Sequence, residues 1–397
     1  SGTGPFAPLS LTIAPDTAQW ARDFLAPHGG EQLTWVAVQV GASDPMKAWR
    51  PQLFGQTLAA LSRQAPVGYV FIGTEEEQKA IHLAQTTYRQ TGGTAPFCDA
   101  VGKTSLPQLA AVLSQCRLLL TNDTGPMHLA VAVGTPVVDL SVGHVDFRET
   151  GPYGPGHWMV QPDLECAPCG FDQVCFHHGC KDRLVPDQIA ALCMHVLTGA
   201  AFPRSITGAR IYRSRADEDG LGSTELQAGR EDPLVEWYGR FWRRFWFEEF
   251  TGRASQVPSH PEPSPDSADA LVIFEHLTPL AKQLVSTAEE LLRLTSKRPL
   301  PVSALKQVQL RETAQRQQIL ALSMQSPATA SLTVAMVRDT HNDDGSDLTG
   351  LAQARLATYR RWHKRLHAVA TTFHAFTTAQ GPVRHGKSRH LPMARSA

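Results

Sequence analysis

The segment "TNDTGPMHLAVAVGTPVVDL", residues 121–140, decides the fold, because it joins a strand to a helix and the helix to another strand. An apolar run, "LLL" at 118–120, precedes a turn of short polar side chains, and the helical pattern "PMHLAVAV" follows that turn directly. The run "PVVDLS" at 136–141 comes next. This order predicts a βαβ unit, in which the two strands are parallel.

The same alternation fills the first half of the chain. Apolar runs rich in β-branched and aromatic residues stand at 35–40, 69–73 and 157–162, and segments with apolar residues at spacings of three and four separate them. The sequence therefore predicts an α/β fold, with a Rossmann-like parallel sheet domain over residues 1–205 and a Cys-rich insert at 163–183 within it.

The second half of the chain has a different pattern. Long stretches repeat apolar residues in heptads, from Phe274 to Leu291 and again from Ala352 to Phe376, which is typical of packed helices. We therefore expect a small antiparallel helical bundle. The predicted parts are a linker at 206–232, an aromatic helix at 233–253, a Pro/Ser linker at 254–270, the helical bundle at 271–378 and a disordered tail at 379–397.

Composition narrows the function classes. The 397 residues include 37 basic and 37 acidic side chains, so net charge gives no reason to expect a nucleic-acid partner. No run of 18 apolar residues and no signal-peptide core is present, and four of the seven cysteines cluster within fifteen residues. We expect a soluble chain in a reducing, cytoplasmic environment.

The turn between 122 and 125 has the features of an anion site. Ligands of open α/β sheets bind at the carboxyl ends of strands, and this turn lies at such an end. Asp123 or Thr124 can cap the helix, Gly125 lets a ligand approach the backbone, and His128 can donate to an anionic oxygen. The alternative is a capped helix whose histidine is merely solvated.

Two further turns follow strands in the same way. Ser43 and Lys47 lie after the run at 35–40, and the Lys47 ammonium could bind a phosphate, although a solvated surface lysine is the alternative. Glu75 lies after the run at 69–73, where a carboxylate could accept from a ribose hydroxyl or simply cap a helix.

Three segments in this order, "GASDPMKAWRPQLF", "GKTSLPQLAAVLSQCRLLLTNDTGPMHLAVAVGTPVVDL" and "TGPYGPG", resemble the carboxyl-terminal domain of glycosyltransferase family 9, the ADP-heptose:lipopolysaccharide heptosyltransferases. The resemblance covers about residues 10–200 and implies one half of a GT-B architecture, in which two Rossmann-like domains face each other. It implies an ADP-sugar or other nucleotide-sugar donor and a glycan or lipid-linked acceptor. The donor contacts that it implies are Ser43 and Lys47 on the pyrophosphate, Glu75 or Glu76 on the ribose, and Asp123, Thr124, Gly125 and His128 on the diphosphate-sugar.

The amino-terminal domain of that family, which carries its proposed catalytic base, has no counterpart in these 397 residues. The catalytic residue is therefore unknown, and no cofactor is required for the reaction. We expect the donor-binding half of a glycosyltransferase, either as a fragment or completed by a partner. The alternative function is a non-catalytic scaffold, with a vestigial nucleotide-sugar domain and a bundle that binds a partner or forms an oligomer.

The cluster "ECAPCGFDQVCFHHGCKD" spaces four cysteines as C-x2-C-x5-C-x4-C. Four soft ligands at this spacing could hold a structural Zn²⁺ ion, and disulfides or free thiols are the alternatives. The expected ligands are Cys166, Cys169, Cys175 and Cys180.

The aromatic helix "VEWYGRFWRRFWFEEF", residues 235–250, mixes tryptophans with arginines. Such a helix could lie at a membrane surface, which would place the protein peripherally at the inner face of a bacterial inner membrane. Because its aromatics point nearly all round, a helix packed against the sheet domain or a partner is the other interpretation.

Overall fold

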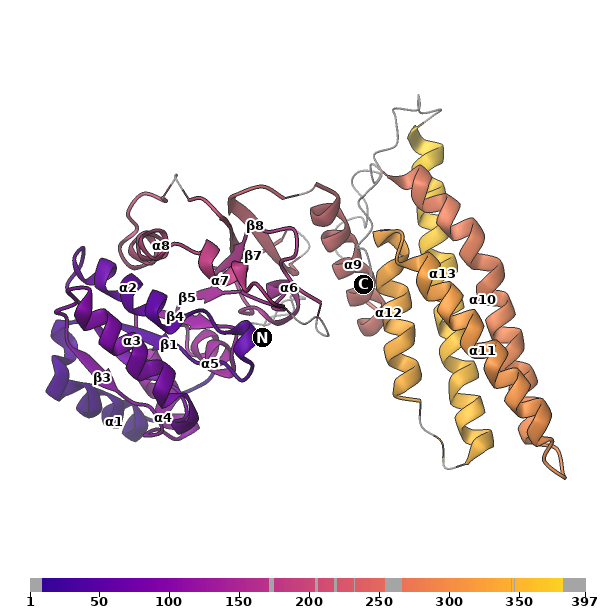
Figure 1. Cartoon of the computed structure of the whole chain (residues 1–397), viewed down its shortest axis with the longest axis horizontal. Helices are drawn as coiled ribbons and strands as arrows, with labels where there is room; N and C mark the ends of the chain where they lie inside the picture. The colour runs from indigo at the N-terminus through magenta and orange to yellow at the C-terminus, as the bar shows by residue number, and fades with distance from the viewer. Residues whose placement is uncertain are drawn as a thin grey trace. The chain divides into compact units, whose positions relative to one another are not determined.

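The computed structural model describes residues 9–170, 175–203, 206–217, 220–231, 233–253, 266–343, 345 and 347–380. Its contacts divide the chain into two compact units, residues 1–231 and 232–397, here called the sheet unit and the helical unit (Figure 1). Most of the predicted Pro/Ser linker and the predicted tail from residue 381 onward lie outside the described residues.

The sheet unit contains an eight-stranded sheet with the order β3-β2-β1-β4-β5-β6-β7-β8. The pairings from β3 across to β6 are parallel, and β7 and β8 add an antiparallel extension. The order 3-2-1-4-5-6 is that of a Rossmann fold, which confirms the predicted class. The strands are β1 (Thr34–Gln39), β2 (Val67–Ile72), β3 (Phe97–Asp99), β4 (Leu118–Asn122), β5 (Val137–Leu140), β6 (Trp158–Pro162), β7 (Ala209–Ala216) and β8 (Gly222–Ala228).

Helices cover both faces of the sheet. Val36 and Val38 of β1 point into a core cluster with α2, α3 and α8, whereas Trp35 and Ala37 point into another with α1, α4 and α5. This alternation is what a strand buried on both faces requires. The helices are α1 (Pro15–Leu25), α2 (Pro51–Ser62), α3 (Gln78–Gln90), α4 (Leu106–Ser114), α5 (Gly125–Ala132), α6 (Phe147–Thr150), α7 (Gly179–Arg183) and α8 (Pro186–Thr198), with short 3-10 turns η1 (Ala26–His28), η2 (Gly30–Gln32), η3 (Pro45–Lys47) and η4 (Glu75–Glu77).

The prediction of a linker at 206–232 was wrong. This segment forms the β7–β8 hairpin, and β7 pairs along β6 from Trp158 to Pro162. The adjacent side chains Ile211 and Tyr212 are both fully buried, while Arg213 is exposed. The hairpin consists largely of polar residues, so it resembles a polar linker in composition, and this similarity explains the error.

The helical unit confirms the predicted helical region. It contains α9 (Pro233–Thr251), α10 (Ser267–Thr295), α11 (Val302–Ser323), α12 (Pro327–His341) and α13 (Leu348–Gln380). Both predicted heptad seams are buried, and they meet in an antiparallel pair, because Phe274 of α10 contacts Phe373 of α13 while Leu291 and Ala352 share a cluster at the other end.

Helix α9 packs inside the helical unit. Its Trp242 Nε1 donates to the Pro327 carbonyl oxygen at 2.9 Å, and its Trp246 Nε1 donates to Ser331 Oγ at 3.0 Å, so both contacts reach α12. Trp237 makes an edge-to-face contact with Phe373 of α13. Tyr238 and Phe241 are buried in the bundle core, and the three tryptophans of α9 pack against it partly buried. Within the described part of the chain, none of the helices combines the length and the hydropathy that crossing a membrane demands.

Candidate functional site

The three polar turns predicted to form a site lie side by side. Strand β1 pairs with β2 on one flank and with β4 on the other, so the loops after these strands meet at one edge of the sheet. The edge between β1 and β4 is the position where the strand order reverses. Ligands of Rossmann folds bind at this switch point.

Asn122, the last residue of β4, fixes the loop after β1. Its side-chain oxygen accepts from the Trp49 backbone N–H at 2.9 Å, and its amide nitrogen donates to the Val40 carbonyl at 2.8 Å and to the Gly41 carbonyl at 3.3 Å. The side chain is fully buried. Asn122 therefore holds Ser43 and Lys47 close to the start of α5, a role that its place at the end of an apolar strand could have suggested.

The start of α5 is open. Thr124 occupies the N-cap position but makes no side-chain capping bond, because its hydroxyl donates to the Asn122 carbonyl at 3.2 Å instead. The prediction that Thr124 or Asp123 caps this helix was wrong for this reason. A Cβ placed on Gly125 would meet nothing within 4 Å, so the space in front of this turn is free. The helix dipole favours an anion there.

Asp123 is 7% exposed, and its carboxylate already has a hydrogen-bond partner within the protein. One of its carboxylate oxygens accepts a hydrogen bond from the Thr150 hydroxyl at the end of α6. Sequence reasoning did not find Thr150, because it lies 27 residues away in the "FRET" segment. Asp123 is thus oriented by α6 beside the open turn.

Two side chains near the open turn can bind an anion. Lys47 ends η3, in the loop after β1, and the start of η3 is fixed by Asp44, since that carboxylate accepts from the Met46 N–H at 2.8 Å. His128 lies one turn into α5. Lys47 is half-buried and His128 is exposed, and among the described residues neither side chain has a hydrogen-bond or ion-pair partner. The Lys47 ammonium is therefore available to an anionic ligand, and the His128 imidazole can donate a hydrogen bond to one.

Glu75 lies further along the edge, after β2. It begins η4, but its neighbour Glu77 makes the capping box with Thr74 and accepts from the Gln39 amide at 3.0 Å. The Glu75 side chain reaches over Gly102, where a Cβ would come within 2.6 Å of Glu75 Cγ. Two strand spacings of about 4.8 Å separate β2 from β4, so the ends of these strands lie roughly 10 Å apart.

The segment after β6 supports the loop that carries Lys47. Lys181 of α7 donates from Nζ to the Pro45 carbonyl at 2.5 Å, and its own carbonyl accepts from Trp49 Nε1 at 2.8 Å. Gly143, in the loop after β5, has a φ of 68° and approaches the Met46 carbonyl oxygen so closely that a Cβ would lie 2.2 Å from it. Three loops from separate strands are thus tied together around η3.

A second carboxylate lies buried beneath this edge. Asp139 of β5 pairs in register with Thr121 of β4 and is fully buried. The pKa of Asp139 is raised to about 8, mainly by burial and also by the charge of Asp123, while the hydrogen bond from Ser141 Oγ at 2.5 Å acts in the opposite direction. A protonated Asp139 is therefore the favoured form at neutral pH. The apolar residues around it in "PVVDLS" did not indicate that Asp139 would be protonated.

The four clustered cysteines lie near one another. Burial raises the pKa of the Cys169 thiol, and the neighbouring thiols of Cys166, Cys180 and Cys175 raise it further. Their exposure differs, from an exposed Cys166 to a buried Cys180. In the described portion of the chain, which omits 171–174 inside this cluster, no three His, Cys, Asp or Glu side chains are arranged to hold a metal ion. The zinc site stays a prediction from spacing alone.

The strand order defines a Rossmann-type domain with an open switch point between β1 and β4. Comparison with known families agrees with this class. Residues 10–178 match the model of glycosyltransferase family 9 (heptosyltransferase), and the match lies in the amino-terminal part of this chain. The resemblance seen in the sequence is confirmed at this level.

Individual relatives are distant and are matched in part. A lipooligosaccharide heptosyltransferase 2 of Campylobacter jejuni is 26% identical over 154 residues, which are 38% of this chain and 47% of that protein. A lipopolysaccharide heptosyltransferase 3 of Escherichia coli is 28% identical over 123 residues, which are 30% of this chain and 35% of that protein. The chain thus spans less than half the length of these two curated relatives.

Among solved structures, the E. coli ADP-heptose LPS heptosyltransferase II is similar over 48% of this chain and 54% of its own, with 16% identity and a TM-score of 0.39.

Proposed function

We propose that the sheet unit is the donor-binding half of a glycosyltransferase and that it holds a nucleoside diphosphate sugar at the edge between β1 and β4. The observation that carries this proposal is the open start of α5, with Lys47 in the neighbouring loop after β1 and His128 one turn into the helix, both without a partner among the described residues. A diphosphate is bound by this combination of an ammonium, hydrogen-bond donors, backbone N–H groups and free space.

The spacing along the edge fits the length of a nucleotide. The diphosphate would lie at the start of α5, with the ribose toward Glu75, roughly two strand spacings away. The family resemblance supports ADP as the nucleotide and a heptose as the sugar. Asp123, oriented by Thr150, would accept from sugar hydroxyls, because a carboxylate beside a diphosphate is repulsive.

Transfer of the sugar leaves a nucleoside diphosphate with additional negative charge. Lys47 and His128 would stabilise this charge as it develops, and stabilisation of the transition state lowers the barrier. The base that activates the acceptor hydroxyl would belong to the other half of the enzyme, and we assign it to none of these residues. The acceptor would be a lipopolysaccharide or another glycan, which would bring the protein to the cytoplasmic face of the membrane.

The test is the affinity of the full chain for ADP, measured by isothermal titration calorimetry. We expect Lys47→Ala and His128→Ala each to weaken binding at least tenfold, because each removes one charge-assisted contact worth about 1.5–3 kcal/mol. Arg117→Ala is the matched control, since Arg117 is an exposed cation that directly precedes β4 and therefore lies at the opposite, amino end of that strand. Absence of saturable binding at millimolar ADP would remove the proposal.

The second candidate, a scaffold, is favoured by one observation: the helical unit has a core of its own and supplies none of the predicted donor contacts. Here the measurement is the molar mass in solution, by light scattering, of the full chain and of a chain lacking residues 233–378. A change from oligomer to monomer on deletion would support association through the bundle, and equal states would exclude it.

A further inference from the structure

A cavity of about 510 Å³ lies in the helical unit between α10, α11 and α13. Helix α12 has 15 residues, compared with 22 in α11 and 33 in α13, so it is too short to run beside these helices over their whole length. Asp343, two residues beyond the end of α12, accepts from Arg355 of α13. The cavity continues past that point, where no part of α12 separates α11 from α13.

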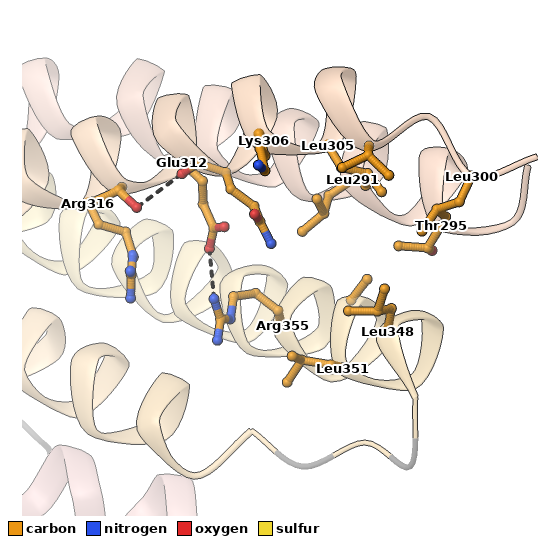
Figure 2. A pocket seen from close by; sticks show the side chains of 14 residues that line it. Leu291, Thr295, Leu300, Leu305, Lys306, Glu312, Arg316, Leu348, Leu351 and Arg355 are labelled. Atoms are coloured by element: carbon orange, nitrogen blue, oxygen red, sulfur yellow. Dashed lines mark hydrogen bonds and ion pairs between the residues drawn. The ribbon is translucent and has the colours of Figure 1, made fainter.

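One end of the cavity is apolar. Leu300, Leu305 and Leu348 gather there, together with Leu291 and Leu351, from all three helices and the α10–α11 loop (Figure 2). Leu348 is 53% exposed, although it faces this group of leucines. An apolar surface of this kind favours a hydrocarbon ligand, since each buried methylene contributes about 0.8 kcal/mol.

The other end is polar, and part of its charge is internally balanced. Glu312 is 2% exposed, accepts from Arg355 at 3.3 Å and also accepts from the Tyr359 hydroxyl. Arg355 donates in addition to Asp343 at 3.3 Å. Both carboxylates are therefore covered by protein donors.

Two further cations line the cavity. Arg316 of α11 lies at the polar end with Arg355, whereas Lys306, ten residues earlier on α11 and exposed, lies beside the leucines (Figure 2). Within the described residues neither forms an ion pair, and Arg316 Nε is buried without a hydrogen-bond acceptor. Counted over the whole cavity, Lys306, Arg316 and Arg355 outnumber the carboxylates Glu312 and Asp343 by one positive charge.

We propose that this cavity binds a single-chain amphiphile, with its acyl chain among the leucines and an anionic head, a phosphate or a carboxylate, against Arg316. The buried, unpartnered Nε of Arg316 is the group that most requires an acceptor, because an unsatisfied buried donor destabilises the fold. The cavity volume falls within the range of small-molecule sites.

The charges and the leucines that line the cavity disfavour two other kinds of ligand. A cationic amphiphile would meet the excess positive charge, and a free anion would leave the leucine end unfilled. On α11 the lining runs from Val302 to Arg316, which corresponds to about 21 Å of helix at 1.5 Å per residue. An extended chain with a head at one end matches this length. The inference does not depend on the proposed glycosyltransferase function.

The experiment titrates the full chain by calorimetry with decyl phosphate and decanoate below their micelle concentrations, and with decyltrimethylammonium and inorganic phosphate as comparison ligands. We expect one site per chain for the two anionic amphiphiles, and binding at least tenfold weaker for the cation and for phosphate alone. Arg316→Met removes the charge while keeping much of the volume, so it should weaken the anionic amphiphiles at least fivefold. Lys364→Met, an exposed lysine of α13 outside the cavity, is the matched control and should change nothing.

Leu351→Gln supplies a second measurement, since it places a polar group at the leucine end and should weaken the decyl ligands while Arg316 stays in place. Circular dichroism melting of each variant shows that the bundle is folded. Equal affinity for cationic and anionic amphiphiles, or no effect of Arg316→Met in a folded chain, would overturn the proposal. Inorganic phosphate binding as tightly as decyl phosphate would overturn the acyl-chain assignment.

Discussion

Charged side chains occupy different places in the two units. At the edge of the sheet unit, the Lys47 ammonium has no partner among the described residues, whereas in the helical unit Glu312 is buried and is held by Arg355 and Tyr359. An unpaired surface charge contributes little to stability and is available to a ligand. A buried paired charge holds helices together, and its loss leaves the partner uncompensated.

Substitutions of the exposed and of the buried charged residues should therefore change different properties of the protein. Variants at the sheet edge should change ligand affinity with little change in stability, and variants at Glu312 should change stability first. The predictions below test this difference from the largest expected effect to the smallest.

Glu312→Ala should give the largest decrease in the free energy of unfolding. The substitution leaves Arg355 and the Tyr359 hydroxyl without their buried acceptor, and breaking a buried pair costs about 3–5 kcal/mol. Chemical denaturation of the helical unit, followed by tryptophan fluorescence, measures the loss. The control is Glu290→Ala, whose side chain is 41% exposed and paired with Arg311, so a loss below about 1 kcal/mol is expected. Equal losses for the two variants would contradict the comparison.

Asp139→Asn should change how stability depends on pH. The pKa of Asp139 is about 8 in the folded chain against an ordinary value of 3.8, so between these values the folded state holds a proton that the unfolded state has released. Stability therefore falls as the pH rises through this window, and asparagine removes that dependence.

Relative to the natural chain, the Asp139→Asn variant should gain about 2–4 kcal/mol between pH 5 and pH 8. Thermal unfolding at several pH values gives this difference. Asp187→Asn, at an exposed position in α8, is the control and should show no such trend. A constant difference between variant and natural chain would show that Asp139 is ionised throughout.

Asn122→Ala should have an intermediate effect. It removes the bonds to Trp49, Val40 and Gly41 and leaves buried backbone groups unsatisfied, at a cost of about 1–3 kcal/mol. Because the loop that carries Lys47 is then released, ADP affinity should fall as well. Ser43→Ala, exposed in the same loop, should alter stability by less than about 0.5 kcal/mol. Unchanged stability in Asn122→Ala would mean that the loop is held by other contacts.

Gly125→Ala should have the smallest effect on stability. The added Cβ meets no protein atom within 4 Å, so the melting temperature should stay within a degree or so. The same methyl group would occupy space needed by a diphosphate, and ADP affinity should fall at least tenfold. Gly239→Ala, which also adds a Cβ in open space, should affect neither property. Full ADP affinity in Gly125→Ala would place the ligand elsewhere.

Much of the fold follows from apolar periodicity. The runs that became β1, β4 and β5 are buried on both faces, so each reads as a continuous apolar segment. Strand β3 has only three residues, so it is too short for an apolar pattern to be recognised in the sequence. The hairpin of β7 and β8 was missed because half of its side chains face outward, and its composition is that of a polar loop.

The site could be predicted as a set of strand ends but not as a set of contacts. Sequence order places Glu75, Lys47 and Asp123 after separate strands, and only the strand order shows that β1 lies between β2 and β4. The bond between Thr150 and Asp123 depends on how α6 packs, and no local rule reports that packing. That Glu77, and not Glu75, makes the capping box is likewise known only from the three-dimensional positions of Thr74 and Gln39.

The close approach of Gly143 to the Met46 carbonyl has a thermodynamic consequence. With a φ of 68° and no room for a Cβ, Gly143 allows the loop after β5 to press directly on the backbone just before Lys47. A lysine loop held in this way loses its conformational freedom during folding, before any ligand arrives. The entropy lost on binding an anion is then smaller, so more of the attraction between ammonium and phosphate remains as affinity.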